Sequence, residues 1–262
     1  MRRRELLQWF LFLIPASLAA HTKEESMSYS IHRASMRGTS ELGWLSSRFS
    51  FSFAEYHNRH RMGFGALRVI NDDTIKAGTG FGMHPHRDME IVTIVTKGAI
   101  EHRDSEGHHG ITREGEIQYM CAGSGVYHSE YATAEADTEL FQIWIFPDQH
   151  GYMPHYEQRD FRTITESKGW HTLVSGNGSE NSIRIHQEAS IKMIRLSPDE
   201  TVPLPDAAEG HGRLLLVIEG SIALAGETLH PRDEIQITSK EEFDIRALSA
   251  ARLLLFDVPM HR

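Results

Sequence analysis

The sequence reads Gly82-Met83-His84-Pro85-His86-Arg87-Asp88 and then, almost at once, Ile91-Val92-Thr93-Ile94-Val95. If this region is extended, His84 and His86 point to the same face, because side chains alternate across a strand with period two. Two imidazoles then converge on one point. The stretch therefore predicts a β-strand that carries a pair of candidate metal ligands.

A second stretch, Cys121-Ala122-Gly123-Ser124-Gly125-Val126-Tyr127-His128-Ser129-Glu130, repeats the spacing. Here a histidine and a carboxylate, His128 and Glu130, stand two residues apart after a glycine-rich turn. One His-x-His pair arises easily by chance among 17 histidines, but a second pair, His-x-Glu, at the same spacing beside another β-like segment favours a barrel that brings the two pairs together. Three imidazoles and one carboxylate suit a first-row divalent metal and leave room for exogenous ligands.

Short apolar runs recur along the chain, and turn residues such as Asn71-Asp72-Asp73 and Lys97-Gly98 separate them. No helix of convincing length is predicted before Gly151. The pattern favours an all-β sandwich or barrel. The expected strands are Phe49–Phe53, Phe64–Ile70, Ile91–Ile100, Glu116–Met120, Leu140–Phe146, Leu214–Ile218, Glu234–Ile237, Phe243–Ile245 and Leu253–Val258, with others near Thr172 and Ile183.

An internal repeat indicates two copies of one β unit, because Val92–Ile100 aligns with Leu214–Ile222. At the same offset Asp206 and Ala208 stand where the first copy has its two histidines, so the second copy has the fold without the site. The expected organisation is an extension at 1–26, an N-terminal unit with the metal site at 27–155, a connection with the first strands of the second unit at 156–190, and a C-terminal unit without metal ligands at 191–262.

The first 26 residues allow two interpretations. Arg2-Arg3-Arg4, the apolar run Leu6–Ile14 and the small residues near Ala19 are typical of a secretory signal. The apolar run is too short to span a bilayer comfortably. Alternatively, Met27 is the natural beginning of the folded part. A cytoplasmic protein is expected if the chain starts at Met27, and an exported one if residues 1–20 are a genuine signal peptide.

Composition narrows the class of protein. Hydrophobic residues make up 40% and charged residues 24%, as in a folded globular domain. The formal net charge is -9, and no broad basic run follows the extreme N-terminus, which disfavours nucleic-acid binding. Cys121 is the only cysteine, so an intramolecular disulfide is impossible, and a small buried hydrophobe is its expected role.

Several of these motifs together resemble the pirin family of bicupins. The resemblance rests on His84-Pro85-His86-Arg87-Asp88, on Gly98 and on the stretch Gly115–Glu130, and it extends from about Ser28 to Val258. It is closest to the short bacterial members described as quercetin dioxygenases, which usually begin near the position of Met27. The resemblance implies two cupin barrels in tandem, with few short helices.

The resemblance also implies one mononuclear metal in the N-terminal barrel, bound by His84, His86, His128 and Glu130. Iron(II) is the expected ion, and zinc, copper, manganese, nickel or cobalt are alternatives with the same ligands. Glu90 stands where many other cupins place a carboxylate ligand. Because the pirin pattern uses Glu130 for that role, we expect Glu90 to lie just behind the ligands, with direct binding as a lesser alternative.

The implied activity is a metal-dependent dioxygenase that opens the ring of a flavonol such as quercetin with O2 and releases carbon monoxide. In this hypothesis Glu130 is both a ligand and the base that takes the proton of the 3-hydroxyl. Phe51, Phe53, Phe81 and Met120 are the apolar candidates for the pocket wall, with ordinary barrel core as the equally open alternative. His102 and His108-His109 are expected on a loop in solvated positions.

Two alternatives stay open. Eukaryotic pirins share these motifs and are described as metal-dependent, redox-sensing regulators, so this chain could instead bind a protein partner without catalysis. It could also be a metal-binding cupin that acts on another small molecule with two neighbouring oxygen donors.

Overall fold

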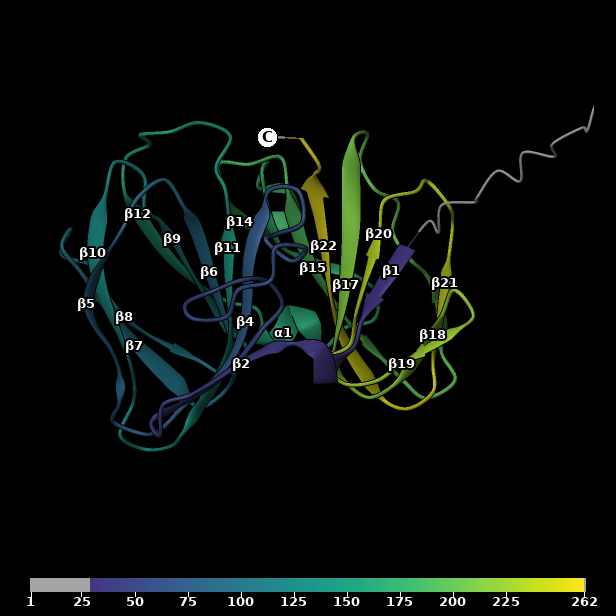
Figure 1. The fold of residues 1–262 in the computed structure, drawn as a ribbon, viewed down its shortest axis with the longest axis horizontal. Coiled ribbons are helices and arrows are strands. Elements are labelled where there is room, and N and C mark those ends of the chain that lie inside the picture. Colours follow the sequence, from purple (N-terminus) through teal and green to yellow (C-terminus); the bar gives the residue numbers. More distant parts are fainter. Residues whose placement is uncertain (1–28, 262) are drawn as a thin grey trace, which may run out of the picture.

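Two β-barrels lie side by side in the computed structural model, which describes residues 29–261 (Figure 1). Each barrel pairs a large seven-stranded sheet with a small four-stranded sheet. Within the described part, helix is limited to α1 (Arg162–Thr165) and the 3-10 turns η1 (Ala34–Met36) and η2 (Ser179–Asn181). The prediction of an all-β fold with two tandem barrels is confirmed. The extension at 1–26 lies outside the described residues.

The first barrel has a large sheet in the order β12-β9-β6-β11-β4-β3-β2 and a small sheet in the order β5-β10-β7-β8. Its strands are β2 (Gly38–Glu41), β3 (Leu45–Phe49), β4 (Leu67–Ile75), β5 (Gly80–His86), β6 (Glu90–Lys97), β7 (Ala99–Asp104), β8 (His109–Arg113), β9 (Glu116–Cys121), β10 (Val126–Ala132), β11 (Thr138–Ile145) and β12 (His155–Asp160).

The second barrel has a large sheet in the order β1-β20-β17-β22-β15-β13-β14 and a small sheet in the order β16-β21-β18-β19. Its strands are β1 (Tyr29–His32), β13 (His171–Ser175), β14 (Ile183–Arg184), β15 (Ser190–Leu196), β16 (Thr201–Pro203), β17 (His211–Glu219), β18 (Ile222–Leu224), β19 (Glu227–Leu229), β20 (Glu234–Ile237), β21 (Asp244–Ala247) and β22 (Ala251–Pro259).

The two barrels repeat one topology, since β6 and β11 pair in the first as β17 and β22 do in the second. Their edge strands come from unexpected parts of the chain. β1 pairs with β20 of the second sheet, and β12 pairs with β9 of the first. Figure 1 shows β1, in purple, among the strands of the C-terminal barrel. The boundaries at 155 and 190 stay predictions. β1 of the second barrel lies in the range expected for the N-terminal unit, and β12 of the first barrel lies almost entirely in the expected connection.

Two local predictions are wrong. The strand expected at Phe49–Phe53 ends at Phe49, because the chain bends there. Asn71-Asp72-Asp73 is not a turn but the middle of β4. Its polar side chains are tolerated in the sheet because they find partners: Ser47 donates a hydrogen bond to Asp73, and Arg232 of the second unit pairs with Asp72 at 2.8 Å.

The alignment of Asp206 and Ala208 with the histidine pair is also wrong. By sheet order, β16 and β21 of the second barrel correspond to β5 and β10 of the first. These strands and their flanks contribute Val202, Leu204 and Ile245 to an apolar core. In the second barrel, hydrophobic packing therefore occupies the place of the histidines.

The two large sheets pack face to face and form the main core of the molecule. Val92 and Ile94 of β6 belong to the same cluster as Leu214 and Leu216 of β17. Burial of a side chain of this size contributes about 1.5–3 kcal/mol. Among the described residues, no helix is long and apolar enough to cross a membrane.

Two glycines of the second barrel, Gly220 between β17 and β18 and Gly226 in the β18–β19 hairpin, differ in how closely another part of the chain approaches them. Gly220 has a φ of +76°, and a Cβ there would meet the carbonyl oxygen of Ala250 at 2.1 Å. Gly226 has the same φ, but a Cβ there meets nothing within 4 Å. We expect Gly226→Ala to cost about 1–2 kcal/mol through backbone strain and Gly220→Ala to cost roughly 1–3 kcal/mol more through the clash. Urea unfolding measures both, and equal losses would contradict the close approach.

Candidate metal centre

β5 and β10 bring the two histidine-bearing stretches together. They pair antiparallel, with His128 opposite His84 and Val126 opposite His86. The turn before β10 requires glycine, because Gly123 has a φ of +44° and a Cβ there would meet the carbonyl oxygen of Tyr152 at 2.0 Å. The glycine-rich turn expected before His128 is present.

Three imidazoles converge at this point. His84 and His86 have ring centroids 4.8 Å apart, and His128 lies 4.4 Å from the first and 4.8 Å from the second. One nitrogen of each ring lies within 4.8 Å of the others. This is the convergence expected from the His-x-His spacing.

The free nitrogens of this cluster fit a metal ion. Nδ1 of His84 donates to the carbonyl oxygen of Gly82 at 2.7 Å, which leaves Nε2 with its lone pair. Nε2 of His128 is buried without a hydrogen-bond partner. Burial, more than the neighbouring imidazoles, lowers the pKa of His86 and of His128 to about 3. Both rings are therefore neutral near pH 7, the form that binds a metal.

Glu130 lies beside His128 rather than among all three histidines. One of its oxygens is within 4.8 Å of the ring nitrogens of His128 and His102. The carboxylate is fixed by two amides: Nε2 of Gln118 donates to Oε1 at 2.7 Å, and Nε2 of Gln142 donates to Oε2 at 2.9 Å. Neutral amides that hold a carboxylate in this way orient it without neutralising its charge.

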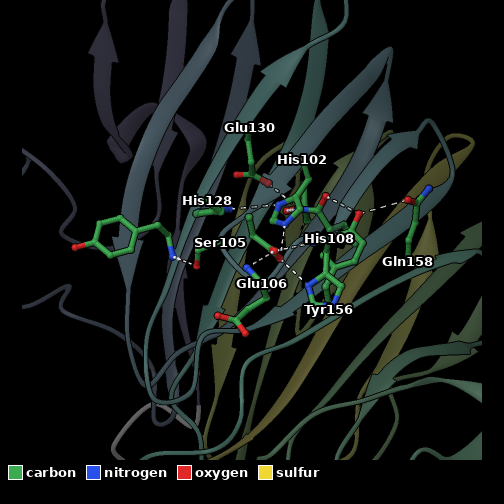
Figure 2. A network of polar contacts seen from close by, with 12 residues as sticks. His102, Ser105, Glu106, His108, His128, Glu130, Tyr156 and Gln158 are labelled. Atoms are coloured by element: carbon green, nitrogen blue, oxygen red, sulfur yellow. Dashed lines mark hydrogen bonds and ion pairs between the residues drawn. The ribbon is translucent and has the colours of Figure 1, made fainter.

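A chain of polar contacts runs from His128 towards the surface (Figure 2). With Nε2 left for a metal, Nδ1 of His128 donates to Nδ1 of His102 at 3.4 Å. Nε2 of His102 then donates to Asp104 at 3.1 Å, and Nδ1 of His108 donates to the same carboxylate oxygen at 2.9 Å. Tyr156 stacks on His102 with ring centroids 4.5 Å apart.

The solvated position expected for His102 is wrong. His102 lies on β7 and is fully buried, because the pleat turns it into the barrel. There it forms a hydrogen bond with Asp104 and stacks on the ring of Tyr156. His108 is half-buried, and His109 at the start of β8 is exposed.

The three histidines line a cavity of about 160 Å³. Phe53 and Phe81 belong to its wall, as expected from the sequence. Phe51 does not line the cavity, because it packs in the core between the barrels. Met120 does not line it either, and packs in an apolar cluster with the lining residue Ile91. The residues around the cavity are Phe53, Asn71, Asp73, Phe81, His84, His86, Ile91, His128, Glu130, Gln142 and Trp144.

Known proteins match the chain over both barrels. The family model Pirin matches residues 31–145, and the model of the quercetinase C-terminal cupin domain matches residues 172–258. A quercetin 2,3-dioxygenase of Escherichia coli K12 is 40% identical over 230 residues, which cover 87% of this chain and 98% of that protein. The chain belongs to the pirin family.

Other relatives agree. A pirin-like protein of Caulobacter vibrioides is 38% identical over 84% of this chain and 95% of its own. The crystal structure of a bacterial pirin from Escherichia coli in complex with nickel(II) superimposes with a TM-score of 0.83 at 38% identity, over 88% of this chain and 99% of that one. The prediction of a pirin, closest to short bacterial members, is confirmed.

The pirin resemblance left several residues of the site unrecognised. Asn71 and Asp73 of β4 and Gln142 and Trp144 of β11 line the cavity. Oδ1 of Asn71 and Nε1 of Trp144 are buried without hydrogen-bond partners, as is Nε2 of His128. Three unsatisfied buried groups around one cavity indicate a place for a polar ligand. Period-two alternation along Leu67–Ile75, taken as one strand, places Asn71 and Asp73 on the same face.

Glu90 lies on the other side of the sheet. It begins β6, where Ile91 faces the cavity, so the pleat turns Glu90 away from the histidines. The expectation that Glu90 lies just behind the metal ligands is wrong.

Asp73 gives the metal-free protein a pH-dependent stability. Burial, more than any other cause, raises the pKa of Asp73 from 3.8 to about 7. Between these values rising pH removes the proton from the unfolded chain but not from the folded one, so it favours unfolding. Asp73→Asn keeps the acceptor for Ser47 and should stabilise the protein by a few kcal/mol at pH 8 but little at pH 4.

Urea unfolding at the two pH values measures this difference. Asp72→Asn is the matched control, because it removes a partner of Arg232 and should destabilise at pH 8. A gain from Asp73→Asn that is equal at both pH values would contradict a buried, proton-binding Asp73.

Proposed function

We propose that this chain is a metal-dependent dioxygenase of the pirin type, which opens the ring of a flavonol such as quercetin with O2. The observation that carries the proposal is the convergence of His84, His86 and His128 on one cavity, with Nε2 of His128 buried and unpartnered. The names of its relatives support the activity, and the nickel complex of one relative supports the metal. A cytoplasmic location stays a prediction.

The proposed ligands are His84, His86, His128 and Glu130. A divalent ion held by them would supply a Lewis acid that polarises the oxygen donors of the substrate. We propose Fe(II) as the ion in the cell, and zinc, copper, manganese, nickel and cobalt fit the same donors. Nickel in a relative does not decide between them, because nickel binds nitrogen and oxygen sites more tightly than iron does in general.

Glu130 is the proposed base for the 3-hydroxyl of the flavonol. Gln118 and Gln142 each donate one amide hydrogen bond to its carboxylate, so further lone pairs stay available to accept a proton. In this proposal the same two amides would orient the carboxylate towards the metal and the substrate hydroxyl. Base and ligand roles are therefore compatible in one side chain.

The aromatic wall suits a planar substrate but limits its size. Phe53, Phe81 and Trp144 surround the cavity. Its volume of about 160 Å³ is below the roughly 300–1,000 Å³ of typical pockets for drug-sized ligands. Part of a three-ring flavonol would lie at the mouth of the cavity, whereas a smaller aromatic molecule with two neighbouring oxygen donors would fit inside.

Anaerobic loading with Fe(II), followed by oxygen consumption and loss of flavonol absorbance with quercetin, tests the activity. We expect turnover by the native chain and its loss in His128→Ala and in Glu130→Ala, because each removes one proposed ligand. His109→Ala is the control and should keep full activity, because this histidine is exposed outside the cavity. Stoichiometric metal without turnover on any flavonol would overturn the dioxygenase and favour a regulator with a protein partner or another small substrate.

The amide of Gln118 is expected to support metal binding. Gln118→Met keeps the length of the side chain but leaves Oε1 of Glu130 without its donor. Loss of such an outer contact typically lowers metal affinity by about 10–100-fold. Competition with a chelating dye measures the affinity. Gln158→Met is the matched control on β12, because its amide donates to Glu116 and not to Glu130. Equal affinity of Gln118→Met and the native chain would contradict the role.

A further inference from the structure

A buried carboxylate lies between the two large sheets, on the face of β6 opposite the histidine cavity. Glu90 has no exposed surface. Its Oε2 accepts a hydrogen bond from the hydroxyl of Tyr119 at 2.5 Å and another from the backbone N–H of His186 at 2.8 Å. Its Oε1 has no nitrogen or oxygen hydrogen-bond partner among the described residues, and the Cys121 thiol lies beside the carboxylate as a weak donor. A buried carboxylate left with an unsatisfied oxygen is costly unless a cation balances it.

Two further ligand types meet Glu90 there. Cys121, the register partner of Glu90 on β9, is buried beside it. His186 comes from the second unit, just before β15, and its Nδ1 lies 3.5 Å from Oε2 of Glu90. The sulfur, one imidazole nitrogen and one carboxylate oxygen all lie within 4.8 Å of one another. No Lys or Arg of the described chain forms an ion pair with Glu90.

We propose that Glu90, Cys121 and His186 form a second metal site, distinct from the three-histidine cavity, that binds a borderline-soft divalent cation such as Zn²⁺. Thiolate, imidazole and carboxylate are the ligands that zinc takes in proteins, and a water molecule can complete four-coordination. The side chain of His186 is 36% exposed, which gives an ion a path to the site.

The surrounding contacts prepare the ligands. Tyr119 and the backbone of His186 hold Oε2, so Oε1 stays available, as outer contacts do for carboxylate ligands generally. Burial, and then the charge of Glu90, raise the pKa of the Cys121 thiol to about 12, so the thiol carries its proton when no cation is present. Binding replaces that proton: the S–H bond breaks, a metal–sulfur bond forms, and one proton leaves to solvent.

The position of the site gives it a structural role. Two ligands belong to the sheet of the first unit and the third to the second unit, so a bound ion links the two. It stabilises their packing by mass action, because the unfolded chain does not hold the three ligands together.

Cobalt(II) titration of the full native chain tests the site. Cys121 is the only cysteine, so a thiolate-to-cobalt charge-transfer band can come from this site alone. We expect the intensity of the band to stop rising once one cobalt ion per chain is bound through sulfur. The band should disappear when added zinc displaces the cobalt. It should persist in the double variant His84→Ala, His86→Ala, which lacks the first site. It should vanish in Cys121→Ser and in His186→Ala but persist in His155→Ala, a neighbouring exposed histidine outside the cluster.

The native chain alone can overturn the proposal. If folded native protein, saturated with cobalt, shows no sulfur charge-transfer band, then Glu90 and His186 form only an ion pair and no second site exists. A band that survives in Cys121→Ser would likewise overturn it. Because the readout is sulfur ligation and not turnover, failure of the dioxygenase activity would leave this test unaffected.

Discussion

The alternation of side chains along β6 is the constraint on which the rest of the structure depends. Thr93 turns into the first barrel, where it donates to Gln142. Val92 and Ile94 turn the other way, into the core between the two large sheets. Glu90, two residues before Val92, also faces the core between the two large sheets. A register slip of one residue would exchange both sets, so apolar packing between the barrels fixes which polar groups face the cavity.

The parts of this design that depend on local periodicity could be predicted from the sequence. His84 and His86 share a face because two residues separate them, and His128 reaches them because a glycine turn precedes its strand. The pairing of β1 with the second barrel and of β12 with the first could not be predicted in the same way. Each edge strand pairs with a segment far away in the chain, and four to six residues carry no signal that selects one sheet edge over another.

The positions of polar residues inside strands are the part of the structure that the sequence predicts least well. The sequence predicts a turn at Asp73, a solvated loop at His102 and a position behind the metal ligands for Glu90, but all three are buried in strands beside polar partners. Ser47 donates a hydrogen bond to Asp73, Asp104 accepts one from His102, and Tyr119 donates one to Glu90. Burying such groups without a partner costs about 1–3 kcal/mol each, so the sequence alone favours exposure. The contacts that reverse this preference exist only in the folded molecule.

Apolar burial in the second barrel offsets the folding cost of the polar interior of the first. The cavity leaves Asn71, His128 and Trp144 with unsatisfied buried atoms, each a cost to folding when no ligand is bound. The equivalent interior of the second barrel is apolar, with Leu204 and Ile245 among its residues. At about 1.5–3 kcal/mol for each side chain of this size, its core offsets those costs. The apolar core of the second barrel therefore stabilises the fold in which the polar site of the first is held.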